Sequence, residues 1–184
     1  MTRGHTVLQV PVPALEPFVL GRYHHYDPTL VSADPHFVHA HVTALGPFLD
    51  PLHIGHSARV TIGRIAFETQ PFAFRLARLD TFPNGIIHLL PEPDDAFRGL
   101  TRRLWQAFPN CPPYAGQFPS ARPHLTLDAR SQTVSEESTR RLLGGLVPVD
   151  CRAERLELVW YESGGSRVLM SWRLGLDDLT DQQR

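Results

Sequence analysis

Two short motifs in this 184-residue chain carry side chains suited to acid–base chemistry. His41-Val42-Thr43 and His124-Leu125-Thr126 are the two places where a threonine follows a histidine by two positions. An imidazole with a pKa of about 6.5 can take up or release a proton at neutral pH. A hydroxyl can donate a hydrogen bond to an oxygen of a bound phosphate. Two imidazoles and two hydroxyls in one cleft would therefore suffice to cleave a phosphate ester without a metal or a covalent intermediate.

Each motif lies in an apolar run typical of a strand and follows a proline-containing loop. Residues two apart on a strand point to the same face, so His41 and Thr43 should project together, as should His124 and Thr126. The residues expected to face the core instead are Val42, Ala44, Leu125 and Leu127. If two lobes are related by a pseudo-twofold axis, the four polar side chains converge on one cleft.

Periodicity and turn residues predict the elements that position these motifs. Strands are expected over residues 6–10, 37–45, 72–77, 86–90, 122–128, 156–160 and 168–172. Helices are expected over residues 13–23, within 54–67, over 94–108 and over 133–143. Asn84-Gly85 predicts a hairpin turn, and Thr133 with Glu136 forms a plausible capping box for the last helix.

The order of elements repeats at an offset of about 80 residues, which indicates two similar lobes. We therefore expect an α+β fold with two pseudo-symmetric lobes, each with an antiparallel sheet and flanking helices, around a central cleft. The chain should form a single bilobal domain over residues 1–184, with a polar tail from about residue 177.

Composition excludes several function classes. The chain has 18 arginines and no lysine, so no lysine nucleophile, Schiff base or P-loop lysine can operate. A formal net charge of −1 argues against wrapping of long nucleic acid and favours a small or end-bound substrate. Cys111 and Cys151 provide no disulfide framework, and no apolar run is long enough to span a membrane. A monomeric, cytoplasmic protein is expected.

Around its two motifs the sequence resembles the 2H phosphoesterase superfamily, which contains the 2'-5' RNA ligase-like proteins and cyclic phosphodiesterases. The segments VPVPALEP, AHVTALGPF, FRLARLDTFPNGIIHLLPEP and PPYAGQFPSARPHLTL carry the resemblance. It implies that His41 and His124 are the acid–base pair and that Thr43 and Thr126 bind phosphate. It also implies a bilobal fold, no cofactor, and as substrate a nucleotide or RNA end with a 2',3'-cyclic phosphate or a 2'-5' linkage, within RNA processing.

Four further residues are candidates for substrate binding. Tyr114 and Phe118, on the loop before the second motif, could stack on a base or pack the loop down. Arg122 should share a face with His124 and could pair with a phosphate. His39 should share a face with His41 and border the cleft. His88 is expected at the surface or in a cap.

Two other functions compete with this interpretation. The same fold could bind a nucleotide or RNA without turning it over. Alternatively, a metal-dependent hydrolase could use the histidine cluster His36, His39, His41, His53 and His56. No Asp or Glu accompanies that cluster at ligand spacing, and it would leave the second motif unexplained.

Overall fold

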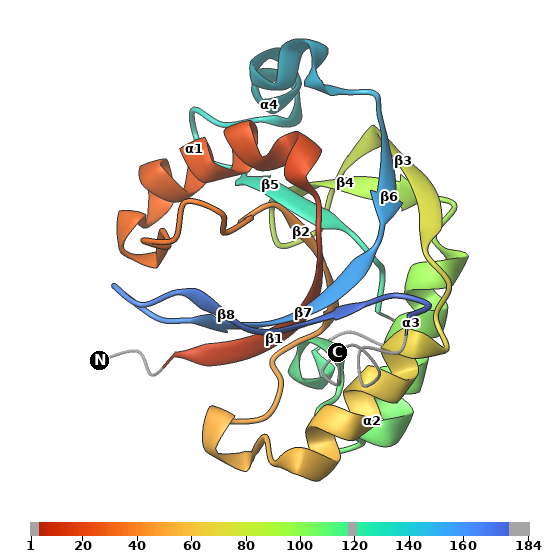
Figure 1. Ribbon diagram of the computed structural model, residues 1–184. Coiled ribbons are helices and arrows are strands. Elements are labelled where there is room, and N and C mark those ends of the chain that lie inside the picture. Colours follow the sequence, from red (N-terminus) through yellow and green to blue (C-terminus); the bar gives the residue numbers. More distant parts are fainter. Residues whose placement is uncertain (1–3, 118–120, 177–184) are drawn as a thin grey trace.

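Residues 4–117 and 121–176 are described by the computed structural model, which contains two four-stranded antiparallel sheets flanked by helices (Figure 1). The first sheet has the strand order β2 (His41–Leu45), β1 (His5–Pro11), β7 (Arg155–Tyr161) and β8 (Arg167–Arg173). The second sheet has the order β5 (Leu125–Ala129), β4 (Ile86–Glu92), β3 (Phe72–Thr81) and β6 (Val149–Ala153). The expected α+β class with two antiparallel sheets is confirmed.

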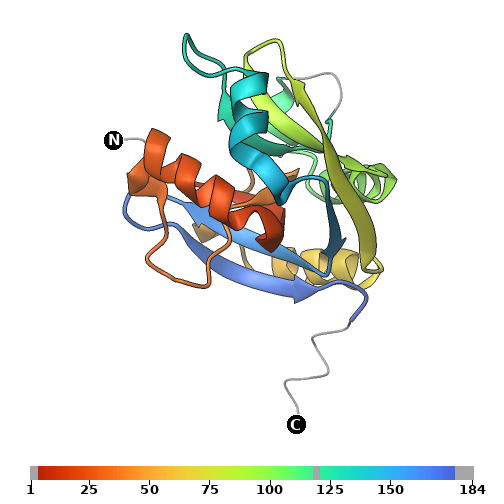
Figure 2. The same cartoon turned by 90° about the horizontal axis from the view of Figure 1, so that it is seen from above.

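In the described part of the chain four α-helices accompany the sheets: α1 (Glu16–Tyr26), α2 (His56–Phe67), α3 (Asp95–Ala107) and α4 (Glu136–Leu143). The apolar stripe of α3 is buried as its spacing predicts, with Phe97, Leu100 and Leu104 at or near zero exposure. α2 and α3 contact the first sheet at β8 and β2, whereas α1 and α4 contact the second sheet at β5 and β3. Figure 2 shows α1 and α4 together on one side of the molecule.

The repeat is present, but its two copies exchange strands. Elements β1, α1, β2, α2 and β3 recur as β4, α3, β5, α4 and β7 at an offset of about 80 residues. However, β3 pairs with β4 of the second copy, and β7 pairs with β1 of the first. Each sheet therefore contains strands from both halves of the sequence, and β2 and β5 occupy equivalent edges.

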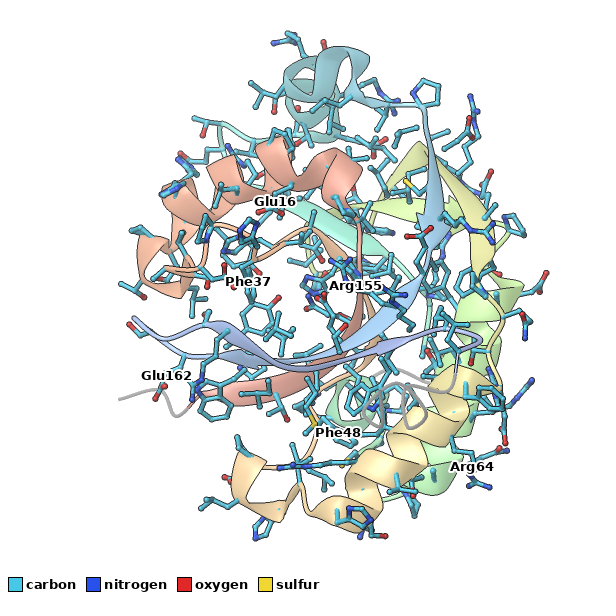
Figure 3. All side chains as sticks on the ribbon, in the orientation of Figure 1. Glu16, Phe37, Phe48, Arg64, Arg155 and Glu162 are labelled. Atoms are coloured by element: carbon cyan, nitrogen blue, oxygen red, sulfur yellow. The ribbon has the colours of Figure 1, made fainter. Side chains whose placement is uncertain are left out.

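The two faces of the first sheet serve different purposes. Leu8, Val10 and Val42 point into the main core, which α2 and α3 cover. On the opposite face Val7, Phe37, Val159 and Tyr161 form a smaller apolar cluster. Figure 3 shows Phe37 and Phe48 on opposite sides of this sheet. The burial pattern of β2, with Val42 and Ala44 buried and His41 and Thr43 partly exposed, agrees with the expected alternation.

Some boundaries differ from expectation. Residues 37–40 are not part of β2. The Ala40 backbone N–H donates to the carboxylate of Glu16 at 2.8 Å, and the Ala40 carbonyl accepts the backbone N–H of Val12 at 2.7 Å. The helix α4 has its capping box at Ser135 and Ser138 and not at Thr133 and Glu136. Strand β6, with its alternating Val149, Cys151 and Ala153, was not expected. The polar tail from residue 177 lies outside the described residues.

None of the helices within residues 4–117 and 121–176 combines the length and the apolar character needed to span a bilayer.

Candidate active site

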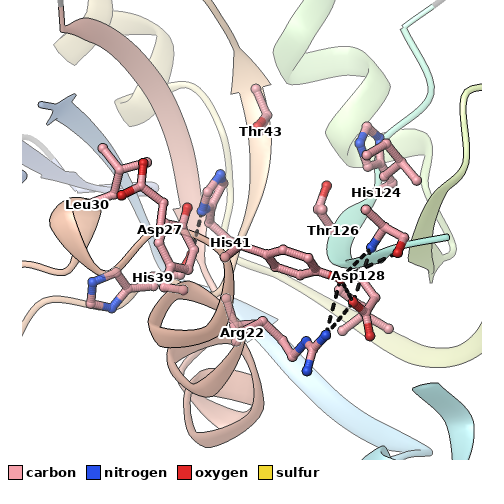
Figure 4. Close-up of a pocket in the computed structure, with 15 residues that line it drawn as sticks. Arg22, Asp27, Leu30, His39, His41, Thr43, His124, Thr126 and Asp128 are labelled. Carbon is pink, nitrogen blue, oxygen red and sulfur yellow. Dashed lines mark hydrogen bonds and ion pairs between the residues drawn. The ribbon is translucent and has the colours of Figure 1, made fainter. Parts of the chain in front are cut away.

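The two histidine–threonine motifs meet where the edge strands β2 and β5 approach each other. His41 is the first residue of β2, and His124 immediately precedes β5. Together with Thr43 and Thr126 they line one cavity of about 270 Å³, which extends along α1 (Figure 4). The structure thus brings together four residues that lie in separate halves of the sequence.

Both imidazole rings are held in the same way. Nδ1 of His41 donates to the backbone carbonyl of His39 at 2.7 Å, and Nδ1 of His124 donates to the carbonyl of Arg122 at 2.8 Å. A carbonyl oxygen can only accept, so Nδ1 carries the hydrogen in each ring. Nε2 is then the nitrogen available for proton transfer with a ligand in the cavity.

A tyrosine flanks each of these rings. The hydroxyl oxygen of Tyr161 lies 3.3 Å from Nδ1 of His41, and that of Tyr114 lies 3.3 Å from Nδ1 of His124. The ring of Tyr114 stacks on His124 at an interplanar angle of 24°. Tyr161 in turn donates to Oε1 of Gln9 at 2.8 Å. These contacts restrict rotation of both imidazoles, which acid–base catalysis requires.

Burial changes the charge state of the pair. It lowers the pKa of His41 from 6.5 to about 4, against the opposing effect of the hydrogen bond to His39. It lowers the pKa of His124 to about 4 as well, helped by the neighbouring charges of His88, His41 and Arg122. Both rings are therefore neutral at pH 7 in the ligand-free protein. An anion bound between the rings would favour protonation of one of them.

This coupling predicts proton uptake on anion binding. An anion between the rings raises the pKa of an imidazole from about 4. At a pH between the pKa of the free protein and the higher pKa of the complex, the complex therefore holds one more proton than the free protein. Affinity should therefore fall about tenfold for each unit of rising pH in that interval. Calorimetry with sulfate, which does not titrate in the range of about pH 5 to 8, in buffers of different ionisation enthalpy measures the uptake.

His36, whose side chain is exposed, offers a matched control. His36→Gln should retain the proton uptake, whereas His41→Gln and His124→Gln should each reduce it. Sulfate binding with no proton uptake in the native protein would contradict the charge state assigned to the pair.

An acid at the start of α1 supports the segment before β2. The carboxylate of Glu16 accepts from Nδ1 of His39 at 2.7 Å and from the backbone N–H of Ala40. Nε2 of His39 accepts from the backbone N–H of Ser32 at 3.1 Å. The carbonyl that orients His41 is therefore fixed by a neighbouring network.

The far side of the cavity carries a buried ion pair that joins the two halves. Asp128, whose side chain is fully buried, accepts from Arg22 at 2.7 Å, from the hydroxyl of Tyr26 and from Thr139 at 3.0 Å. Sequence inspection overlooked Asp128, although its spacing of two residues from Thr126 places it on the face of His124. Arg22 and Tyr26 could not be predicted in this way. They lie on α1, and no local pattern in the sequence indicates that α1 contacts β5.

The four residues predicted to bind substrate lie in different places relative to the cavity. Tyr114 contacts His124 as described above, and Arg122 lies 3.2 Å from Asp80 beside the loop of Tyr114. His39 lines the cavity, but both of its ring nitrogens are engaged within the protein. Phe118 lies outside the described residues. Across residues 4–117 and 121–176, no three His, Cys, Asp or Glu side chains gather as a metal site, so the histidine cluster does not assemble there.

His88 is not at the surface, contrary to expectation. It is fully buried on β4, directly opposite Thr126, and its ring lies 5.3 Å from that of His124. Gln9 holds the equivalent position in the first sheet, opposite Thr43, and is also fully buried. The nearly continuous apolar run of β4 concealed this placement, because the strand is buried on both faces.

A family model described as the 2'-5' RNA ligase superfamily matches residues 11–165 of the chain. No curated protein sequence matches at a significant level.

Several solved structures share the fold. TT0787 of Thermus thermophilus is 19% identical with a TM-score of 0.64, and the match covers 93% of this chain and 98% of that one. LigT of E. coli in complex with 3'-AMP is 17% identical with a TM-score of 0.55, covering 94% and 99%. A protein described as a phosphoesterase is 16% identical with a TM-score of 0.56, covering 94% and 99%. LigT has also been solved with NADP+, ATP and phosphate.

Proposed function

The chain belongs to the 2'-5' RNA ligase superfamily, and from that premise we propose that it is a phosphoesterase acting on 2',3'-cyclic phosphates or 2'-5' phosphodiesters of nucleotides or RNA ends. The observation that carries the proposal is the shared cavity of His41, Thr43, His124 and Thr126, with both Nδ1 atoms bonded to backbone carbonyls. LigT, which has the same fold, has been solved with 3'-AMP and with phosphate.

The proposed mechanism uses the two imidazoles in opposite protonation states. Nε2 of the neutral imidazole removes a proton from water, whose oxygen attacks phosphorus. The other imidazole, protonated when the anionic substrate binds, gives its proton to the leaving ribose oxygen. Thr43 and Thr126 donate hydrogen bonds to the non-bridging oxygens as negative charge grows on them. After one turnover the two imidazoles have exchanged protonation states, and proton exchange with water restores the starting state.

These four side chains are sufficient for the chemistry, so we propose that the enzyme needs no metal and forms no covalent intermediate. The exchange of strands between the two sheets supports one bilobal domain along the chain. We further propose that the enzyme is a cytoplasmic monomer engaged in RNA processing. Its net charge of −1 suits a small or end-bound substrate.

The test is a product assay at about pH 7 in the presence of EDTA. At this pH, substrate binding should raise the pKa of one imidazole so that it takes up a proton and can act as the acid. The substrates are a set of 2',3'-cyclic nucleotides and a 2'-5'-linked dinucleotide. We expect turnover of at least one substrate, with the product identifying the broken bond. Loss of turnover on adding EDTA would contradict the metal-independent mechanism. Binding without turnover of any of these would favour a nucleotide-binding module.

A further inference from the structure

Each sheet carries a row of three polar residues that lie opposite one another on neighbouring strands. Each row begins at the threonine of a motif, continues to a buried side chain with a nitrogen atom, and ends at a carboxylate. The rows are Thr43, Gln9 and Glu157 across β2, β1 and β7, and Thr126, His88 and Asp80 across β5, β4 and β3. Directly opposite residues of antiparallel strands project from the same face, so both rows share the face of their motif.

The middle residue of each row has one nitrogen that makes no hydrogen bond. Gln9 and His88 are both fully buried. Oε1 of Gln9 accepts from the hydroxyl of Tyr161 at 2.8 Å. Nδ1 of His88 donates to the backbone carbonyl of Ile86 at 3.1 Å. The Nε2 atom of each side chain has no hydrogen-bond partner within residues 4–117 and 121–176, and a buried nitrogen of this kind is stabilised when a partner comes within reach.

Both side chains adjoin the catalytic rings. The ring of His88 lies 5.3 Å from the ring of His124. The hydroxyl of Tyr161, which bonds Gln9, lies 3.3 Å from Nδ1 of His41. In each row the adjacent hydroxyl is that of the threonine, which can turn between staggered rotamers. An N–H that donates to this hydroxyl oxygen leaves the hydroxyl hydrogen free for a phosphate oxygen, and such a chain of hydrogen bonds strengthens its members.

The two Nε2 atoms differ in when they can donate. Nε2 of Gln9 is an amide nitrogen and carries hydrogens at every pH. Nε2 of His88 carries a hydrogen only when the ring is charged, because Nδ1 holds the single hydrogen of the neutral ring. Burial lowers the pKa of His88 from 6.5, against the opposing effect of the hydrogen bond to Ile86. The ring is therefore neutral at pH 7 in the ligand-free protein.

Charged groups face His88 from several other elements. Against the effect of burial, the carboxylates of Asp80 on β3 and Glu136 on α4 raise the pKa of His88. The guanidinium of Arg122, before β5, lowers it, and repulsion between the charged rings of His88 and His124 opposes protonation of both. An anion bound in the cavity adds negative charge and favours the protonated ring. His88 can therefore gain its second hydrogen when an anion binds at acidic pH.

We propose that Gln9 and His88 are positioning residues for the two catalytic threonines. Each donates a hydrogen bond to the hydroxyl oxygen opposite it and so directs the hydroxyl hydrogen at a bound phosphate. Gln9 does so at every pH, whereas His88 does so only when its ring is protonated. The contribution of Thr126 to anion binding therefore rises as the pH falls, and that of Thr43 stays constant. The proposal deepens the proposed function and rests on it, because it requires the phosphate to lie between the threonines.

Sulfate affinity, measured by calorimetry between about pH 5 and 8, tests the proposal without requiring turnover. The readout is the ratio of the native affinity to the affinity of Thr126→Val, and the same ratio for Thr43→Val. Protonation of the catalytic histidines affects the native protein and the variants alike, so it cancels from each ratio. We expect the Thr126→Val ratio to rise from about twofold near pH 8 to about tenfold near pH 5. The Thr43→Val ratio should not change with pH.

Variants of the middle residues test each row. His88→Gln gives the second row the same middle side chain as the first, so the Thr126→Val ratio should become independent of pH. Asp80→Asn keeps His88 but removes a carboxylate that favours its charged form, so the rise should move to lower pH. This variant tests His88 even if His88→Gln does not fold. Gln9→Leu removes the amide donor and should lower the Thr43→Val ratio at every pH.

His36→Gln, which changes an exposed histidine outside the cavity, is the matched control and should leave both ratios as they are in the native protein. Thermal unfolding verifies that each variant is folded.

The outcomes separate the two proposals. A Thr126→Val ratio that does not change with pH, or that keeps its pH dependence in folded His88→Gln, would overturn the role of His88. An unchanged Thr43→Val ratio in Gln9→Leu would overturn the role of Gln9. If the ratios behave as expected but no phosphodiester is turned over, the proposed function fails and the positioning roles stand. A native protein that binds no sulfate would overturn the anion site and the positioning roles together.

Discussion

His41→Gln and His124→Gln should each lower kcat/KM for the preferred phosphodiester by about 10²–10⁴-fold. Each substitution removes one of the two groups that move protons, and glutamine cannot replace either. The two imidazoles act in one step, so kcat/KM of the double variant should be little lower than that of the less active single variant. Steady-state kinetics of the three variants, with product identification, measures the effect.

The hydroxyls should contribute less than the imidazoles. Thr43→Val and Thr126→Val each remove one hydrogen bond to a non-bridging oxygen, which corresponds to a loss of about 10²-fold or more. His36→Gln serves as the matched control, because it changes an exposed histidine outside the cavity. Thermal unfolding verifies that each variant is folded. Turnover by a folded His124→Gln at the native rate would show that the pair does not catalyse the reaction.

Asp128→Ala should lower the free energy of unfolding by about 3–5 kcal/mol. The substitution leaves the guanidinium of Arg22, which is 18% exposed, without its ion-pair partner. It also removes the acceptor for the hydroxyls of Tyr26 and Thr139. Because native domains are stable by only about 5–15 kcal/mol, this is a large fraction of the total. Urea unfolding measures the change, with the same dependence of the free energy of unfolding on urea concentration used for both proteins.

An exposed ion pair provides the comparison for Asp128. Asp150 pairs with Arg75 at 2.9 Å, but their side chains are 78% and 50% exposed. Asp150→Ala should therefore change stability by about 1 kcal/mol or less. Similar losses for Asp128→Ala and Asp150→Ala would mean that the junction between α1, β5 and α4 adds nothing beyond a surface contact.

Local pattern predicted the elements whose burial follows a simple period. The stripe of Phe97, Leu100 and Leu104 indicated α3, and Asn84-Gly85 indicated the hairpin of β3 and β4. The pattern did not predict side-chain contacts from distant elements. Residues 37–40 have strand character but are not part of β2, and the Ala40 backbone N–H donates to the carboxylate of Glu16.

The sequence predicted four catalytic residues and four substrate-binding candidates, and the structure adds further residues around them. The two His-x-Thr motifs were identified because strand geometry makes residues two apart share a face. Gln9 and His88 were missed because they sit beneath the threonines on strands buried on both faces, where apolar and polar positions do not alternate clearly.

The sequence by itself determined which chemistry was available and at which spacing. The motifs at His41 and His124, the repeat of about 80 residues and the lack of lysine are all local or compositional properties. Only the tertiary structure decided that β3 and β7 change sheets, that the edge strands β2 and β5 approach each other and that α1 contacts β5. It also decided the charge of the pair, because a pKa of about 4 arises from burial, and burial depends on elements far away in the sequence.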